Sequence, residues 1–151
     1  MKDIEELARI AVDCGFQLHK RLGPGLLESA YLLVMEERLR RCGLNVRREV
    51  PISIRVDDIF IEAAFRADLI VEDRLVIELK SQEALAKVHQ KQLLTYLRLM
   101  DLPLGLLMNF GAATFAEGCR RVVNNHTEFA SSRLRVSQID AATGRNERTP
   151  Q

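Results

Sequence analysis

The sequence predicts an α/β protein in which helices pack against a mixed sheet, and three observations support this fold class. The chain has 151 residues, of which 47% are hydrophobic and 28% are charged, as expected for one soluble globular domain. Apolar residues recur at helical spacing in the segments 4–22, 26–42 and 83–100. Between the last two of these segments, the pattern changes to the alternation and β-branched runs that are typical of strands.

The N-terminal segment predicts two helices. A stripe of apolar residues runs over Ile4–Leu22, and Gly23-Pro24-Gly25 ends this helix because proline cannot continue it. A second helix is expected to begin at Pro24 or Gly25 and to reach about Cys42, with Gly43 after its last turn. We expect His19, one turn before the break, to be a capped or core histidine.

A meander of about three strands is predicted next. Val46–Val56 alternates between apolar and polar residues, and Pro51 indicates that part of this strand lies at a sheet edge. Ile59–Phe65 forms the following strand. The runs Leu69–Val71 and Leu75–Ile77 then flank a short polar turn, a pattern that predicts a β-hairpin.

One more helix and two more strands complete the predicted domain. The helix is expected over about Glu83–Met100, with Ser81 as its capping residue. The continuous apolar run Leu104–Phe110 is typical of a central buried strand. Arg121–Val123 is expected to form a further short strand.

Composition also suggests a domain boundary and a class of protein. After residue 124, Asn, Thr, Ser, Arg and Gln dominate, so we expect a globular domain over 1–124 and a polar C-terminal appendage or tail over 125–151. The net charge is +1, but 17 of the 22 basic residues are arginine, whose fork suits phosphate. Three cysteines without CxxC spacing, no evident signal peptide and no apolar run of membrane length predict a cytoplasmic protein with free thiols.

The hairpin carries Asp68, Glu78 and Lys80 among apolar residues. If Glu72–Arg74 is a three-residue loop, Asp68 lies directly opposite Glu78 with their Cβ atoms ~5 Å apart, and Lys80 follows on the same face. A two-residue loop would turn Asp68 to the other face. Because an unpaired buried charge is costly, these side chains should share a partner or a metal ion.

A hard divalent cation, bound by carboxylates, a backbone carbonyl and water, fits two adjacent carboxylates. Lys80 beside such an ion could orient or help to deprotonate a water molecule, which is the chemistry of phosphodiester hydrolysis. The alternative is a buried ion pair within the sheet.

Polar residues elsewhere join this hypothesis, each with a structural alternative. Glu28 lies near the N-terminus of the second helix, where it could stabilise the helix dipole or serve the site, and Tyr31 on the same face could hydrogen-bond it. Gln92 and Tyr96 lie four residues apart on an apolar helix face, where they could position a phosphate or bond to backbone in the core. His89 is expected at the rim of the cleft.

These motifs, in this order, resemble the PD-(D/E)XK nuclease superfamily in its RecB-like branch. Asp68 and Glu78-Leu79-Lys80 match the pattern that names the superfamily, with Ala67 in place of its proline. The segment Gly25-Leu-Leu-Glu28-Ser-Ala-Tyr31 looks like the signature of the small GxxExxY family. The resemblance implies a restriction-endonuclease-like α-β-β-β-α-β core, preceded here by an extra N-terminal helix.

The resemblance also implies a function. It implies a Mg²⁺ or Mn²⁺ ion held by Asp68, Glu78 and the carbonyl of Leu79, with Glu28 assisting directly or through water. Lys80 would serve the attacking water, and the substrate-binding residues would be Gln92, Tyr96, Tyr31 and His89. The substrate would be nucleic acid, with DNA favoured over RNA. A non-catalytic nucleic-acid-binding protein or a regulatory partner is the alternative, and a homo-oligomer is left open.

Overall fold

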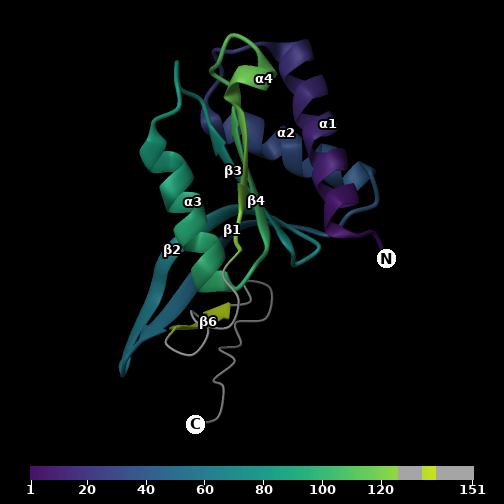
Figure 1. The fold of residues 1–151 in the computed structure, drawn as a ribbon. Helices are drawn as coiled ribbons and strands as arrows, with labels where there is room; N and C mark the ends of the chain where they lie inside the picture. Colours follow the sequence, from purple (N-terminus) through teal and green to yellow (C-terminus); the bar gives the residue numbers. More distant parts are fainter. Residues whose placement is uncertain (126–133, 139–151) are drawn as a thin grey trace.

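The computed structural model describes residues 1–125 and 134–138 (Figure 1). In chain order, the elements of these ranges are α1 (Ile4–Leu22), α2 (Glu28–Arg41), β1 (Val46–Val56), β2 (Ile59–Val71), β3 (Leu75–Lys80), α3 (Lys87–Met100), β4 (Leu104–Asn109), α4 (Phe115–Gly118), β5 (Cys119–Val123) and β6 (Leu134–Gln138).

Within the described residues, the strands form one sheet in the order β5-β4-β3-β2-β1-β6. The β3–β4 pair is parallel, and all the other neighbouring pairs are antiparallel. The parallel pair requires a crossover connection, which α3 provides. The predicted α/β fold class with a mixed sheet and a restriction-endonuclease-like core is therefore confirmed.

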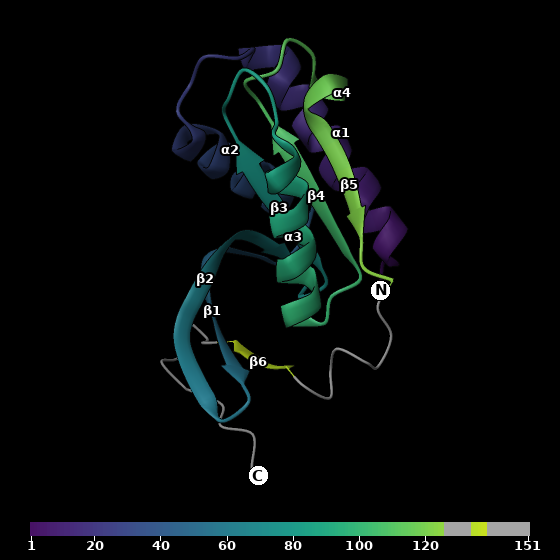
Figure 2. The same ribbon diagram turned by 60° about the vertical axis from the view of Figure 1, so that its left-hand side comes forward.

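Helices cover both faces of the central strands. Figures 1 and 2 show α1 and α2 on one side of β3 and β4, and α3 on the other side. Side chains alternate between two cores accordingly: Ile77 and Leu106 pack with α1 and α2, whereas Val76 and Leu107 pack with α3. β4 is buried along its whole length, as expected of a central strand.

The β1–β2 pair turns from one helix layer to the other near Asp68. Leu69 packs in the core under α1 and α2, but Ala67, two residues away, packs in the core under α3. On a flat strand these two side chains would share one face, so the strand must twist sharply between them. The register places Glu49 opposite Asp68 at this point, and Glu49 has a left-handed φ of 52°. The twist therefore coincides with the predicted site.

The connections into α2 and α3 differ from the prediction. α2 begins at Glu28 rather than at Pro24 or Gly25, because the residues before Glu28 form a loop held by side-chain hydrogen bonds. α3 begins at Lys87 rather than near Glu83, and Ser81 does not cap it. The Ser81 hydroxyl instead donates to the carbonyl of Leu26 at 2.6 Å, which ties the two connections together.

The remaining strands agree with the prediction in part. β2 is one continuous strand, so the segments predicted on either side of residue 66 are joined. Pairing of β1 with β6 begins at Ile52, which leaves Pro51 just outside it, as an edge position requires. The strands β4 and β5 are found where they were expected, whereas α4 and β6 were not predicted. Most of the predicted tail after residue 124 lies outside the described residues.

His19 is a core histidine, as expected. It is 7% exposed, and its Nε2 lies 2.9 Å from the carbonyl oxygen of Ala112.

Candidate active site

Asp68 and Glu78 lie where the ladder between β2 and β3 opens. The backbone pairs of this ladder are Val71–Leu75, Ile70–Val76 and Leu69–Ile77, which confirm the three-residue loop and its register. The ladder ends at the Leu69–Ile77 pair. Beyond them, the N–H of Asp68 donates to Oε1 of Glu78 at 3.0 Å. The N–H of Leu79 donates to Oδ2 of Asp68 at 2.9 Å. Each carboxylate thus accepts a hydrogen bond from the backbone of the other strand.

This arrangement brings two carboxyl groups together in a buried place. Glu78 is buried, with only 8% of the residue exposed. Burial first, and the neighbouring charge of Asp68 second, raise the pKa of the Glu78 carboxyl from 4.5 to about 9, although Lys80 opposes the shift. Two carboxylates in this position need a positive partner if both are to be ionised.

Glu28 belongs to α2 and interacts electrostatically with the hairpin that carries Asp68 and Glu78. It is the first residue of α2, where a carboxylate interacts favourably with the helix dipole. Partial burial raises the pKa of Glu28, the charges of Lys80 and His89 lower it, and the charge of Asp68 raises it. These influences require all three groups to lie within electrostatic reach of Glu28. The N-terminus of α2 is therefore brought to the hairpin.

Lys80 lies at the end of β3 and is half-buried. Its positive charge lowers the pKa of both Glu28 and Glu78. The carbonyl of Lys80 accepts a hydrogen bond from Phe110 N–H at 2.9 Å, which holds the end of β3 against β4.

Tyr96 presents its phenol to the same place from α3. Its ring stacks on Phe65 of β2, with centroids 4.0 Å apart and an interplanar angle of 8°. Burial raises the pKa of Tyr96, and the charges of Glu78 and then Asp68 raise it further. The ring is thus held against β2, and the charges of both carboxyl groups act on its phenol.

Gln92 and His89, the other two predicted site residues on α3, differ in burial and in hydrogen bonding. Gln92, one turn before Tyr96, is exposed. His89 is half-buried, and its Nδ1 accepts a hydrogen bond from the N–H of Ala86, the N-cap residue, at 3.2 Å. This bond leaves Nε2 as the ring nitrogen of His89 that could serve a substrate.

Tyr31 does not join this group, and its predicted hydrogen bond to Glu28 is wrong. The residue is fully buried and stacks on Phe110 with centroids 4.7 Å apart. Its hydroxyl donates to the carbonyl of Gly23 at 2.5 Å and accepts from the N–H of Leu26 at 3.2 Å. Because a phenol has one proton to donate, none is left for a carboxylate. Tyr31 therefore shapes the loop that leads into Glu28.

Asn109 is a residue that sequence reasoning missed. It is fully buried at the end of β4. Its Oδ1 accepts from the N–H of Gln82 at 2.9 Å and of Gly111 at 3.1 Å, and its Nδ2 donates to the carbonyl of Gln82 at 2.9 Å. These bonds fix the loop that follows Lys80. The available signal was a single amide at the end of the otherwise apolar run 104–110.

The donor set fits a hard divalent cation with few protein ligands. In residues 1–125 and 134–138, no group of three or more His, Cys, Asp or Glu is placed to hold a metal ion. A cation at Asp68 and Glu78 must then complete its coordination with a backbone carbonyl and water. Mg²⁺ commonly binds in this way, with one or two carboxylates.

Three comparisons with known proteins bear on the family of this chain. Searches of curated proteins and of solved structures returned no match. In the described part of the chain, no helix is both long and apolar enough to cross a membrane. Residues 5–122 match a family model described as the PD-(D/E)XK nuclease superfamily, and this range contains every residue of the candidate site. The chain therefore belongs to the PD-(D/E)XK nuclease superfamily.

Proposed function

We propose that this protein is a nuclease that depends on Mg²⁺ or Mn²⁺ and hydrolyses phosphodiester bonds of nucleic acid, with DNA favoured over RNA. Nucleases of this superfamily generally use divalent metal ions. The observation that carries the proposal is the buried pair of Asp68 and Glu78, whose mutual repulsion helps to raise the pKa of Glu78 to about 9. A divalent cation would relieve this repulsion. The structural alternative, a buried ion pair, would place opposite charges side by side and would not produce the repulsion.

The metal ligands in this proposal are Asp68, Glu78 and the carbonyl of Leu79, with Glu28 assisting through water, because no third acidic side chain of the described residues is placed to hold the ion with them. The Asp68 and Glu78 carboxylates are already oriented by the backbone N–H groups of Leu79 and Asp68. A bound divalent cation would supply Lewis-acid activation of water and phosphate. Fixed ligands of this kind reduce the reorganisation that the reaction requires.

The remaining roles fall to groups around the pair. Lys80, near both Glu28 and Glu78, donates hydrogen bonds that orient the attacking water and balances the negative charge of the carboxylates. The Tyr96 phenol and the Gln92 amide orient the phosphate from α3, and Nε2 of His89 assists at the rim. Tyr96 is supported by the effect of the Glu78 and Asp68 charges on its pKa, and His89 by the effect of its charge on the pKa of Glu28. Gln92 is included because it lies one turn before Tyr96 on α3.

We further infer a finer classification. The segment Gly25-Leu-Leu-Glu28-Ser-Ala-Tyr31 supports membership of the GxxExxY family in the RecB-like branch, with residues 1–124 as the nuclease domain. The free thiols of Cys14, Cys42 and Cys119 support a cytoplasmic location.

The test is cleavage of labelled DNA and RNA in Mg²⁺ and in Mn²⁺ by the wild type and by Glu78→Gln. Glu37→Gln, which removes an exposed carboxylate from α2, is the matched control. We expect cleavage by the wild type and by the control, and loss of cleavage by Glu78→Gln. Cleavage retained by Glu78→Gln would remove Glu78 from the proposed ligands. Binding of nucleic acid without any cleavage would replace the proposal with a non-catalytic role.

A further inference from the structure

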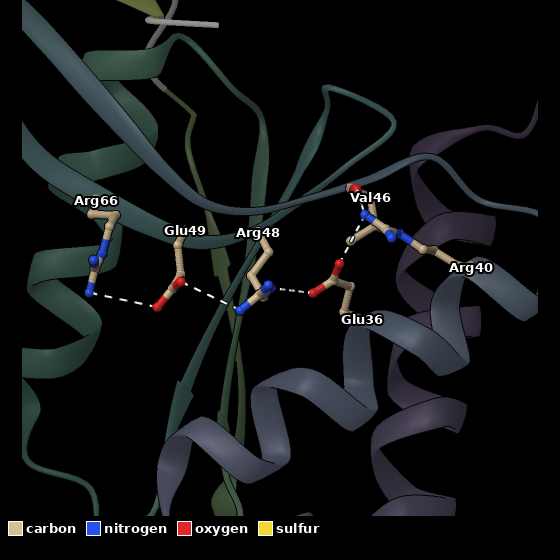
Figure 3. Close-up of polar contacts among 6 residues, drawn as sticks. All are labelled: Glu36, Arg40, Val46, Arg48, Glu49 and Arg66. Carbon is tan, nitrogen blue, oxygen red and sulfur yellow. Dashed lines mark hydrogen bonds and ion pairs between the residues drawn. The ribbon is translucent and has the colours of Figure 1, made fainter. Parts of the chain in front are cut away.

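A row of alternating charges connects α2 to the β1–β2 pair. It consists of Arg40, Glu36, Arg48, Glu49 and Arg66, and we refer to it as the charge row (Figure 3). Glu36 Oε1 lies 2.9 Å from Arg40 Nη2, and its Oε2 lies 2.5 Å from Arg48 Nε. Glu49 Oε2 lies 3.5 Å from Arg48 Nη1, and its Oε1 lies 3.8 Å from Arg66 Nη2.

One end of the charge row lies beside the candidate active site. Arg66 precedes Asp68 by two residues on β2. The register of β1 and β2 places Glu49 opposite Asp68. The backbone positions of Arg66 and Glu49 are thus adjacent to that of Asp68, and we expect a strand of nucleic acid bound at Asp68 and Glu78 to extend toward the charge row.

The ion pairs loosen toward this end. The Glu36 side chain is 12% exposed and has two close arginine partners, whereas the Arg66 side chain is 65% exposed and has one partner at 3.8 Å. Exposed ion pairs of this kind contribute little to stability and exchange partners readily. The charge row as a whole has three arginines and two glutamates, and therefore one positive charge in excess.

Glu49 is held between the two arginines by an uncommon backbone conformation. Its φ of 52° lies in the left-handed region, which residues other than glycine rarely adopt. Such conformations occur where the surrounding structure requires them, often next to functional sites. Here the conformation accompanies the twist of β1 and presents the Glu49 carboxylate to Arg48 and Arg66.

We propose that Arg66 and Arg48 bind a backbone phosphate of the nucleic acid next to the one that is cleaved, and that Glu49 is the counter-ion this phosphate displaces. The proposal rests on the proposed nuclease function. A guanidinium group binds two phosphate oxygens in the same geometry as two carboxylate oxygens, so phosphate can replace Glu49 directly. Glu49 therefore lowers the affinity for nucleic acid while it keeps both arginines oriented.

The experiment measures binding of a fluorescein-labelled DNA duplex and of the corresponding single strand over a series of salt concentrations. All proteins carry Glu78→Gln, so that cleavage does not interfere. Arg66→Gln and Glu49→Gln are compared with Arg41→Gln and Glu37→Gln. The control residues form an exposed ion pair on α2 at 3.0 Å, in the groove between α1 and α2 rather than in the charge row.

We expect Arg66→Gln to weaken binding severalfold and to reduce the slope of log affinity against log salt by about one, as the loss of one phosphate contact requires. Glu49→Gln should strengthen binding severalfold, because the phosphate no longer competes with a carboxylate. Arg41→Gln and Glu37→Gln should both bind like the parent protein.

Two results would overturn the proposal. If both charge-row variants bind like their controls and only their melting temperatures change, the charge row is structural, and the proposed nuclease function is unaffected. If the parent protein binds neither form of DNA, nor the same sequence as RNA, and the wild type cleaves none of them, the nuclease function and this proposal fail together. The cleavage assay with wild-type protein distinguishes the two cases independently.

Discussion

Asp68 and Glu78 hold β2 and β3 together at the point where the backbone ladder between these strands ends. The N–H of Asp68 donates to Glu78, and the N–H of Leu79 donates to Asp68. The two residues therefore have a structural role as well as a proposed catalytic one. Substitutions that keep an acceptor at these positions separate the two roles, because they preserve the hydrogen bonds and remove the charge.

The first prediction concerns the pH dependence of stability without metal. The pKa of Glu78 is about 9 in the folded protein, against 4.5 as the ordinary value. Between pH 4.5 and about pH 9, the folded state therefore retains a proton that the unfolded state has already released. The stability contributed by protonated Glu78 is fully present below about pH 4.5 and is lost as the pH rises through about 9.

Thermal unfolding in EDTA checks this prediction. The wild type should lose stability with rising pH at up to about 1.4 kcal/mol per pH unit more steeply than Glu78→Gln, which has no proton to lose at this position. Equal slopes for the two proteins would show that Glu78 is ionised in the folded state without metal.

A second prediction concerns added metal. Mg²⁺ or Mn²⁺ should raise the melting temperature of the wild type above neutral pH, because a cation offsets the repulsion between Asp68 and Glu78. At a hundred times the dissociation constant, the gain is about 2.7 kcal/mol. Glu78→Gln and Asp68→Asn should gain much less. Equal gains in the wild type and in both variants would place the metal elsewhere.

The third prediction concerns Tyr31→Phe. The substitution keeps the stack on Phe110 and removes the hydroxyl that bonds Gly23 and Leu26. The free energy of unfolding should fall by about 1–3 kcal/mol, since buried backbone groups lose their partner. Denaturant unfolding measures this loss. An unchanged stability would mean that water replaces the hydroxyl and that Tyr31 does not hold the loop before Glu28.

Tyr96→Phe is the matched substitution on α3, and the opposite outcome is expected. Its ring should keep the stack on Phe65, so the free energy of unfolding should stay within about 0.5 kcal/mol of the wild type. Cleavage should fall, because the phenol near Glu78 and Asp68 is lost. The pair of assays, unfolding and cleavage, distinguishes Tyr31 from Tyr96. Unchanged cleavage by Tyr96→Phe would leave this tyrosine with a packing role alone.

Local patterns in the sequence determined most of the elements. The helical stripe of Ile4–Leu22 and the continuous apolar run in β4 were sufficient, because period and burial are properties of neighbouring residues. The same holds for the central feature of the site. A three-residue loop and a period of two are enough to place Asp68 opposite Glu78.

The tertiary structure decided everything that depends on contacts between distant segments. α2 begins at Glu28 rather than at Pro24 because later residues hold the loop before it. The Tyr31 hydroxyl donates to the carbonyl of Gly23, and the Ser81 hydroxyl donates to the carbonyl of Leu26, 55 residues earlier in the chain. Nor could spacing alone reveal that Tyr31 faces Phe110, or that Glu28 lies near Lys80. The charge row joins Glu36 on α2 to Arg66 on β2 through a twist at Glu49. A sequence pattern specifies which face of an element is buried, but only the packed fold determines which other element covers it.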